Sequence, residues 1–288
     1  MRKRLIWLTM AAAAVTPVFG STIINLGTAS SFGLLGGTIS NTGTSGTAPF
    51  ASNVVGDVGA TVTITGFPPG TATGTTFTSP NGPSTVVGTA YSDFESAFIT
   101  AEGLTATGSY TTATSQTFLG NTVYASSSTI STATGTNLTF DAQGDPTALF
   151  IIRVNGAFTV NGVMTFTLDG QAQADNIFWI VGSDATISVG SAGPIAFDGN
   201  ILAGDTFTMS AASGGSGVLA GTINGCVFAT NANTLAGITD VGGCAATSAN
   251  GGGSVPEPGS AGLVSLGGLL GILAWRKVRV SLFGSSLR

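Results

Sequence analysis

Histidine is absent from this 288-residue chain, and only 7% of its residues are charged. Arg153 is the only Lys or Arg between residues 5 and 275. A domain with a single cation lacks the basic surface that nucleic-acid binding requires, so we exclude that class of function. Two cysteines without histidine are too few for a structural metal site, and we expect no metal and no cofactor.

The shortage of charge does not indicate disorder. Unfolded segments combine low hydrophobicity with high net charge, whereas this chain is 43% hydrophobic, with Val, Ile, Leu and Phe at alternate positions. Such alternation predicts strands with one face buried and one exposed. The 44 glycines, with many Thr and Ser residues, supply the turns between short strands.

Two rounds of three short strands occupy residues 148–197, and similar rounds precede and follow them. The first strand of each round, 148–154 and 176–181, is almost wholly apolar, which predicts cover on both faces. The second and third strands alternate apolar with small polar residues. This order predicts a mainly β fold, a three-sided solenoid with one side covered by another element.

The covering element is predicted at residues 85–102. Val87, Tyr91, Phe94, Phe98 and Ala101 are spaced four, three, four and three apart, which places them along one side of an α-helix. Ser84 or Thr85 can cap its start, and Gly103 ends it. We expect Arg153 to face this helix, where it either pairs with Glu95 or Asp93 or stays solvated and unpaired.

The second strands and one earlier strand expose small polar residues and no charge, which predicts a flat lattice of methyl and hydroxyl groups. The threonines at 129, 159, 186 and 208 are taken as equivalent positions of successive rounds. Threonine is stiff at χ1 and can hold an ordered layer of water, so ice is a candidate partner. The alternative is that threonine simply favours strands. The candidate contact residues are Thr129, Ser131, Thr159, Asn161, Thr186, Ser188, Thr206, Thr208, Ser210, Thr61, Thr63 and Thr65.

An enzyme is the rival reading, because β-solenoids also carry polysaccharide lyases and hydrolases. Asp141, Asp169 and Asp198 follow the third strands at matching places, but at turn-adjacent positions where Asp commonly bonds local backbone. With no histidine and one arginine in the domain, we expect no catalysis. A second rival is an adhesin or matrix protein that binds extracellular polysaccharide, for which exposed aromatic side chains would be the signal.

The sequence predicts one domain with an export signal at each end of the chain. Residues 1–20 combine a basic start with an apolar stretch and predict a signal peptide, and residues 21–245 form the domain. A Gly/Ser linker follows at 246–254. Residues 255–288 resemble a PEP-CTERM sorting signal, with Pro-Glu-Pro, an apolar segment at 261–275 and a basic tail. That resemblance implies transient membrane anchoring and a secreted or cell-surface protein of a Gram-negative bacterium.

Six motifs follow one another over roughly residues 24–235: LGTASSFGLLGG at 26–37, GDVG at 56–59, ITGFPPG at 64–70, TFDAQGDP at 139–146, LFII at 149–152 and NIFWIVG at 176–182. In this order they resemble the DUF3494-type microbial ice-binding (antifreeze) proteins. The resemblance implies an irregular right-handed β-solenoid of triangular cross-section with one long α-helix packed alongside. It also implies ice as the partner of the helix-free threonine-rich side, and we expect the protein to be a monomer.

Cys226 and Cys244 are the only cysteines of the chain. The predicted signal peptide sends them to an oxidising compartment, where paired cysteines form disulfides. We expect one disulfide that closes the C-terminal coil.

Overall fold

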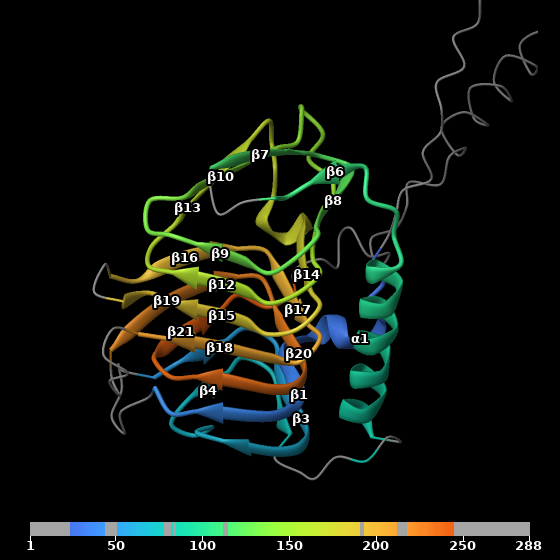
Figure 1. Cartoon of the computed structure of the whole chain (residues 1–288). Helices are drawn as coiled ribbons and strands as arrows, with labels where there is room; N and C mark the ends of the chain where they lie inside the picture. Colours follow the sequence, from blue (N-terminus) through green and yellow to red (C-terminus); the bar gives the residue numbers. More distant parts are fainter. Residues whose placement is uncertain are drawn as a thin grey trace, which may run out of the picture.

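The computed structural model describes residues 24–43, 51–77, 82, 85–111, 115–190, 193–211 and 218–244. The predicted signal peptide, the linker at 246–254 and the segment 255–288 lie outside these residues. The described part is mainly β-structure with parallel strand pairs and one α-helix, α1 (Val86–Glu102), which confirms the predicted class (Figure 1). None of its helices has the length and apolarity needed to cross a membrane.

The side of the solenoid that faces α1 includes the predicted first strands at 148–154 and 176–181, which the structure has as β11 (Phe150–Val154) and β14 (Ile177–Val181). β14 is buried along its whole length, as its apolar sequence predicts, because the interior covers one face and the helix side covers the other. From one end of the stack to the other, the strands are β6 (Gly108–Ser109), β8 (Thr122–Ser126), β11 (Phe150–Val154), β14 (Ile177–Val181), β17 (Asn200–Ala203), β20 (Val227–Leu235), β1 (Phe32–Asn41), β3 (Asp57–Thr65) and β5 (Thr76–Phe77).

The second side carries no helix among the described residues. Its strands lie side by side in Figure 1, and the chain alternates between buried apolar and accessible polar residues along each of them. They are β9 (Ile130–Thr132), β12 (Phe158–Asn161), β15 (Ala185–Ser188) and β18 (Thr206–Ser210), followed by the C-terminal halves of β20, β1 and β3.

The third side is divided into two sheets. Asp141 lies beside Asp169 in the first sheet, whereas Asp198 lies beside Asn224 in the second, so the predicted acidic row is not continuous. The first sheet holds β7 (Gln116–Leu119), β10 (Asn137–Asp141) and β13 (Thr165–Asp169). The second holds β16 (Ile195–Asp198), β19 (Leu219–Asn224), β21 (Ile238–Val241), β2 (Asn53–Val54) and β4 (Thr71–Ala72).

The order of coils in space differs from their order in the chain. Strand β1 lies between β20 and β3, with Leu34 beside Val227, so the first coils of the chain join the last one. Helix α1 then leads from that end back along the stack to β6, where the remaining coils begin (Figure 1). Two short 3₁₀ turns, η1 (Gly27–Ser31) and η2 (Ala174–Asn176), complete the described elements.

Strands β1 and β20 are long because each bends from the helix side onto the second side. The register between them shifts by one residue at the bend, between Gly36 and Thr38. A Cβ atom at Gly37 would lie 2.4 Å from the backbone oxygen of Asn231. The two bent backbones can approach this closely only because residue 37 has no side chain.

Helix α1 was predicted at residues 85–102, and both of its predicted caps are present. Thr85 Oγ1 accepts a hydrogen bond from the backbone N–H of Gly88 (3.1 Å), and Gly103 ends the helix. Val87, Phe94 and Ala101 are fully buried against the helix side. Tyr91 donates its phenolic hydrogen to the backbone oxygen of Thr230, and burial, with a smaller contribution from Glu95, raises the pKa of Tyr91 to about 12. This bond fixes the helix at the bend of β20.

In the described structure, Arg153 neither pairs with Glu95 or Asp93 nor stays solvated, the two alternatives expected from the sequence. Its side chain reaches the end of the helix, where Nη1 donates to the backbone oxygen of Leu104. Within the described residues it makes no ion pair with Glu95 or Asp93, and its buried Nε has no hydrogen-bond partner. Asp93 instead accepts hydrogen bonds from the backbone and the hydroxyl of Thr28, both at 2.7 Å. The two donor groups of Thr28 therefore satisfy Asp93, one of the two carboxylates that the sequence offered as a partner for Arg153.

The interior of the coils is filled by aromatic side chains. Trp179 is completely buried, and its Nε1 donates to the backbone oxygen of Asp198 (3.1 Å), which satisfies its one polar atom. Phe118, Phe140, Phe158 and Phe197 surround its indole. The three sides are therefore held apart by a solid core, which keeps the strand layers at fixed spacing.

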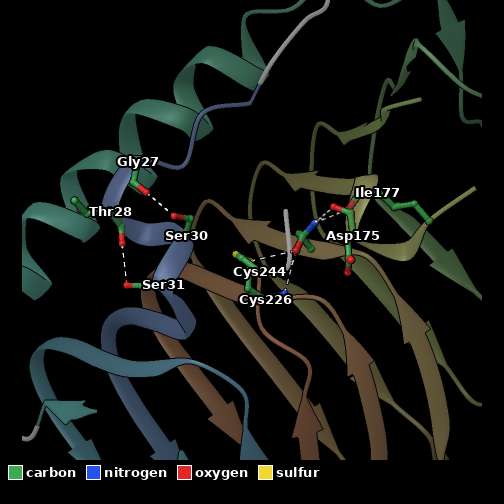
Figure 2. The surroundings of a disulfide bond; sticks show 9 residues. Gly27, Thr28, Ser30, Ser31, Asp175, Ile177, Cys226 and Cys244 are labelled. Atoms are coloured by element: carbon green, nitrogen blue, oxygen red, sulfur yellow. Dashed lines mark hydrogen bonds between the residues drawn. A yellow bond between two sulfur atoms is a disulfide. The ribbon is translucent and has the colours of Figure 1, made fainter. Parts of the chain in front are cut away.

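The structure contains the expected disulfide between Cys226 and Cys244, whose Cα atoms lie 4.6 Å apart. Figure 2 shows it on the helix side of the domain, next to η1. Cys226 directly precedes β20, and Cys244 is the last described residue of the chain. The bond therefore joins the point where the described domain ends to the start of a central strand.

Candidate functional site

The second side of the solenoid presents small polar residues in three parallel rows, which we call the threonine face. Strand register defines the rows, because residues paired across parallel strands lie roughly 4.8 Å apart. The central row is Ser131, Thr159, Thr186, Thr208, Thr234, Ser40 and Thr65. The flanking rows are Thr206, Ala232, Thr38 and Thr63 on one side, and Asn161, Ser188 and Ser210 on the other.

The face has a dry and rigid backing. Between the outward residues, the intervening side chains point into the core, as the alternation predicts. Since branched and aromatic residues fill that space, the strands have little freedom to buckle. Two inward residues are polar and buried, Thr132 and Asn233, and Asn233 Nδ2 donates to the backbone oxygen of Leu35 (2.8 Å). The apolar inward residues are Ile130, Phe158, Val160, Ile187, Phe207, Met209, Leu235 and Ile39, each at most 3% exposed.

The central hydroxyls are available to a partner. Within the described part of the chain, the hydroxyls of Thr159, Thr186 and Thr208 make no hydrogen bond to other protein groups, and all three side chains are partly accessible. Each therefore offers a methyl group and an unbonded hydroxyl in a restricted χ1 rotamer. Neighbouring rows are separated by roughly 6.6 Å along each strand, so the three rows together form a regular two-dimensional array of small side chains.

Side-chain bonds at the flanks fix the edges of this array. Ser188 and Ser210 share a hydrogen bond (3.1 Å between their Oγ atoms), and Asn161 donates to Ser131 Oγ (2.9 Å). At the opposite flank, Thr206 donates to Asp184 Oδ1. Within the central row, Ser131 takes part in one of these bonds and Thr65 donates to the backbone oxygen of Ile39 (3.4 Å), whereas the hydroxyls of Thr159, Thr186 and Thr208 stay free in the described structure.

The threonine face contains no charged residue and no group with a shifted pKa. The carboxyl groups whose pKa is shifted lie elsewhere among the described residues: Asp145, Asp175 and Asp198. Burial also raises the pKa of Tyr110, in the core. The rows therefore consist of neutral side chains, and the carboxylate of Asp184 borders them at Thr206, whose hydrogen bond it accepts.

Thr129 does not occupy the position that sequence spacing assigned to it. Ile130 pairs with Phe158 and Ser131 with Thr159, so Ser131 is the equivalent of Thr159. Thr129 precedes β9, and its Oγ1 accepts a hydrogen bond from the backbone N–H of Ala157 (3.3 Å). The rounds differ in loop length, which displaced the alignment by two residues and left Thr129 outside the rows.

In strand β3, two of the three predicted threonines lie on the face. Thr63 lies beside Thr38 and Thr65 beside Ser40. A bulge follows Ala60 and takes Thr61 out of the register together with Val62, which is 60% exposed. The simple alternation that placed Thr61 with its neighbours therefore fails at the bulge.

Sequence reasoning missed four members of the face: Thr38, Ser40, Ala232 and Thr234. They come from β1 and β20, whose pairing joins the two ends of the domain. Local signals were present, since Thr38-Ile39-Ser40 and Asn233-Thr234-Leu235 both alternate small polar with other residues. Nothing in the local pattern indicates that these distant segments are neighbours.

The fold and the face define a class of protein: a β-solenoid with one uncovered, uncharged array of hydroxyl and methyl groups. The family described as Ice-binding-like matches residues 34–239. The chain belongs to this family. The PEP-CTERM protein-sorting motif matches residues 254–279.

Known relatives agree with this assignment. An ice-binding protein of Nostoc sp. (strain HG1) is 33% identical over 211 residues, covering 68% of this chain and 67% of the relative. The crystal structure of an ice-binding protein from the Antarctic ascomycete Antarctomyces psychrotrophicus is similar, with a TM-score of 0.61 and 29% identity over 76% of this chain and 98% of that one. An ice-binding protein from an Antarctic biological consortium gives a TM-score of 0.60 and 26% identity, covering 82% of this chain and 93% of that one.

Proposed function

We propose that the domain adsorbs to ice through the threonine face and thereby slows ice growth or recrystallisation. The observation that carries the proposal is the register-aligned central row, in which Thr159, Thr186 and Thr208 present free hydroxyl and methyl groups above a buried and largely apolar layer. Membership of the Ice-binding-like family supports the same partner.

The physical basis is the match between a rigid array and an ordered water layer. Threonine side chains lose little entropy when they are ordered, because their χ1 angles are already restricted. Waters held between methyl groups and hydroxyls at regular spacing can join a growing crystal. Each contact is weak, and the regular repetition over several strands makes adsorption stable.

We propose that the domain acts as a monomer, with no cofactor and no catalytic turnover. The acids of the described residues are distributed over different sides rather than gathered in a cleft. Asp141 and Asp169 are neighbours, but each carboxylate accepts a hydrogen bond from nearby backbone, from Gln143 and Gly170 respectively. Such bonds serve the turns that follow the strands.

Binding of extracellular polysaccharide is the weaker alternative. Sugar sites commonly use exposed aromatic rings, and no aromatic side chain of the described residues is exposed. Phe77, Tyr91 and Phe166 are half-buried, and none belongs to the threonine face. The face itself is better suited to a lattice than to a sugar ring.

The match of residues 254–279 to a sorting motif supports export to the cell surface of a bacterium. We propose that residues 1–20 direct Sec export in a Gram-negative cell, and that residues 261–275 anchor the chain transiently before cleavage. The threonine face would then operate outside the cell.

Ice-affinity partition of the pure protein, followed by thermal hysteresis and recrystallisation assays, tests the proposed function. We expect enrichment in the ice fraction and measurable inhibition of recrystallisation. If the protein is excluded from ice and both assays match a buffer control, adsorption to ice is ruled out.

A further inference from the structure

We propose that the Cys226–Cys244 disulfide carries mechanical load from the C-terminal end of the domain to the threonine face. It would let the domain hold ice during the period before cleavage, when the chain is anchored through its C-terminal segment. The inference deepens the proposed function, on which it rests for the identity of the partner, and it uses the sorting motif at residues 254–279 as the anchored end.

The described part of the chain ends at the disulfide. Cys244 is the last described residue, and it is bonded to Cys226 on the helix side of the domain (Figure 2). Both residues are buried, at 6% and 0% exposure, in the apolar layer between the sheet and α1. A pull on the following segment therefore reaches Cys226 directly through a covalent bond.

Strand β20 connects this point to the threonine face. Cys226 directly precedes the strand, and Thr234, a member of the central row, lies near its other end. One edge of β20 pairs with β17 and β18, and the other pairs with β1. Cys226 and Thr234 lie on opposite sides of the bend in β20, and a force between them is resisted by the hydrogen bonds on both edges of the strand.

The route without the disulfide is much weaker. Cys244 would then be connected to the domain only through Gly243 and Gly242 to β21 (Ile238–Val241). This four-residue strand pairs with β19 on one edge and, on the other, with β2 at Val54 alone. Thr239, Asp240 and Val241 also bond to Ser52 Oγ and to the backbone N–H groups of Asn53 and Val55. These contacts hold a strand of four residues, whereas β20 is nine residues long and paired on both edges, so we expect β21 to separate before β20 carries any load.

Asn200 braces the disulfide against the neighbouring coils. Its side chain is completely buried, and its Oδ1 accepts a hydrogen bond from the backbone N–H of Cys226 (3.1 Å). Its Nδ2 donates to the backbone oxygens of Asp175 (2.8 Å) and Ile177 (3.2 Å). The anchored point is thus tied laterally to two further coils, beyond its own strand.

Force spectroscopy on the full chain tests this proposal without ice. One handle is attached after Arg288 and the other to an azide-bearing residue at position 186, so that the pull runs between the C-terminus and the threonine face. The oxidised chain should show no extension of the domain before it unfolds. The Cys226→Ala, Cys244→Ala double variant should release β21 first, giving an early extension on the order of 20–30 Å at lower force.

Moving the C-terminal handle to the N-terminus provides the matched control. Load then enters the domain beside Ile24 and bypasses the disulfide, so the oxidised chain and the double variant should give the same trace. If the double variant does not fold, the unmodified chain is pulled before and after reduction instead. Identical traces from the C-terminal pull, with and without the disulfide, would overturn the proposal.

The double variant also separates this proposal from the proposed function. The threonine face is unchanged in it, so recrystallisation inhibition in free solution should equal that of the unmodified protein. Absence of inhibition in both proteins would refute ice adsorption and leave the mechanical result standing.

Discussion

The ring of Phe158 stacks on the indole of Trp179, with centroids 4.9 Å apart and planes 11° from parallel. Phe158 comes from β12, directly behind the threonine face, and Trp179 comes from β14 on the helix side. This contact crosses the interior and fixes the distance between the two sides. The position of Thr159, next to Phe158 in the chain, is therefore set by aromatic packing in the core.

We predict that Phe158→Ala lowers the free energy of unfolding by about 3–5 kcal/mol, because it removes a fully buried ring and leaves a cavity against Trp179. Chemical denaturation measures the loss. Thr159→Ala, one residue away and partly exposed, serves as control and should cost less than about 1 kcal/mol. Equal losses in the two variants would contradict the packing argument.

A bulky residue in the central row should prevent the face from meeting a flat crystal. We predict that Thr208→Tyr reduces thermal hysteresis roughly tenfold with little change in stability, since the side chain faces solvent. Thr234→Tyr should act similarly, because Thr234 lies beside Thr208. Thr165→Tyr, on the exposed third side, should leave hysteresis unchanged. A loss of activity only with Thr165→Tyr would move the binding surface to that side.

Asp198 should make the domain more stable at acidic pH than at neutral pH. Burial raises the pKa of its carboxyl group, and the hydrogen bond from Asn224 Nδ2 (2.6 Å) offsets part of this shift. A raised pKa means that the folded state holds the proton more tightly than the unfolded chain. The resulting stabilisation is present below the ordinary carboxyl pKa and is lost as pH rises through the raised value.

Asp198→Asn should therefore match or exceed the unmodified protein in free energy of unfolding at pH 7, with the difference disappearing as the pH approaches about 4. Asp145→Asn is the control of opposite sign. Hydrogen bonds from the side chain and backbone of Thr147 lower the pKa of Asp145, so this variant should lose stability at pH 7 and regain parity at strongly acidic pH. Chemical denaturation at several pH values measures the free energy of unfolding of each variant. If its difference from the unmodified protein depends on pH in the same way for both variants, the opposite pKa shifts of Asp198 and Asp145 are refuted.

Arg153→Met should leave stability unchanged or raise it. The substitution keeps the aliphatic contacts and removes a cation whose Nε is buried without a partner in the described structure. A double-mutant cycle with Glu95→Gln should give a coupling energy below about 0.5 kcal/mol. A coupling energy above about 1 kcal/mol would instead indicate an ion pair between Arg153 and Glu95.

Local features of the fold were predictable because they depend on neighbouring residues. The spacing of Val87, Phe94 and Ala101 fixed the helix and its buried side, and the strand alternation correctly placed Phe158 and Ile187 in the core. Both arguments rest on the periods of helix and strand, which do not depend on how the coils are stacked.

The full membership of the threonine face was not predictable in this way. The displacement of Thr129 came from rounds of unequal length, and the loss of Thr61 came from a bulge. Thr38, Ser40 and Thr234 belong to the face only because β1 pairs with β20. That pairing joins segments at opposite ends of the domain, and neither hydrophobic period nor repeat spacing encodes it.

The position of β1 between β3 and β20 also governs the order of events during biosynthesis. Val227, the partner of Leu34, is made only after almost the entire domain has been synthesised. Until then one edge of β1 stays open, and the amino-terminal coils carry unpaired backbone groups that other chains could join. The assembly of the solenoid can therefore finish only after synthesis reaches the last coil.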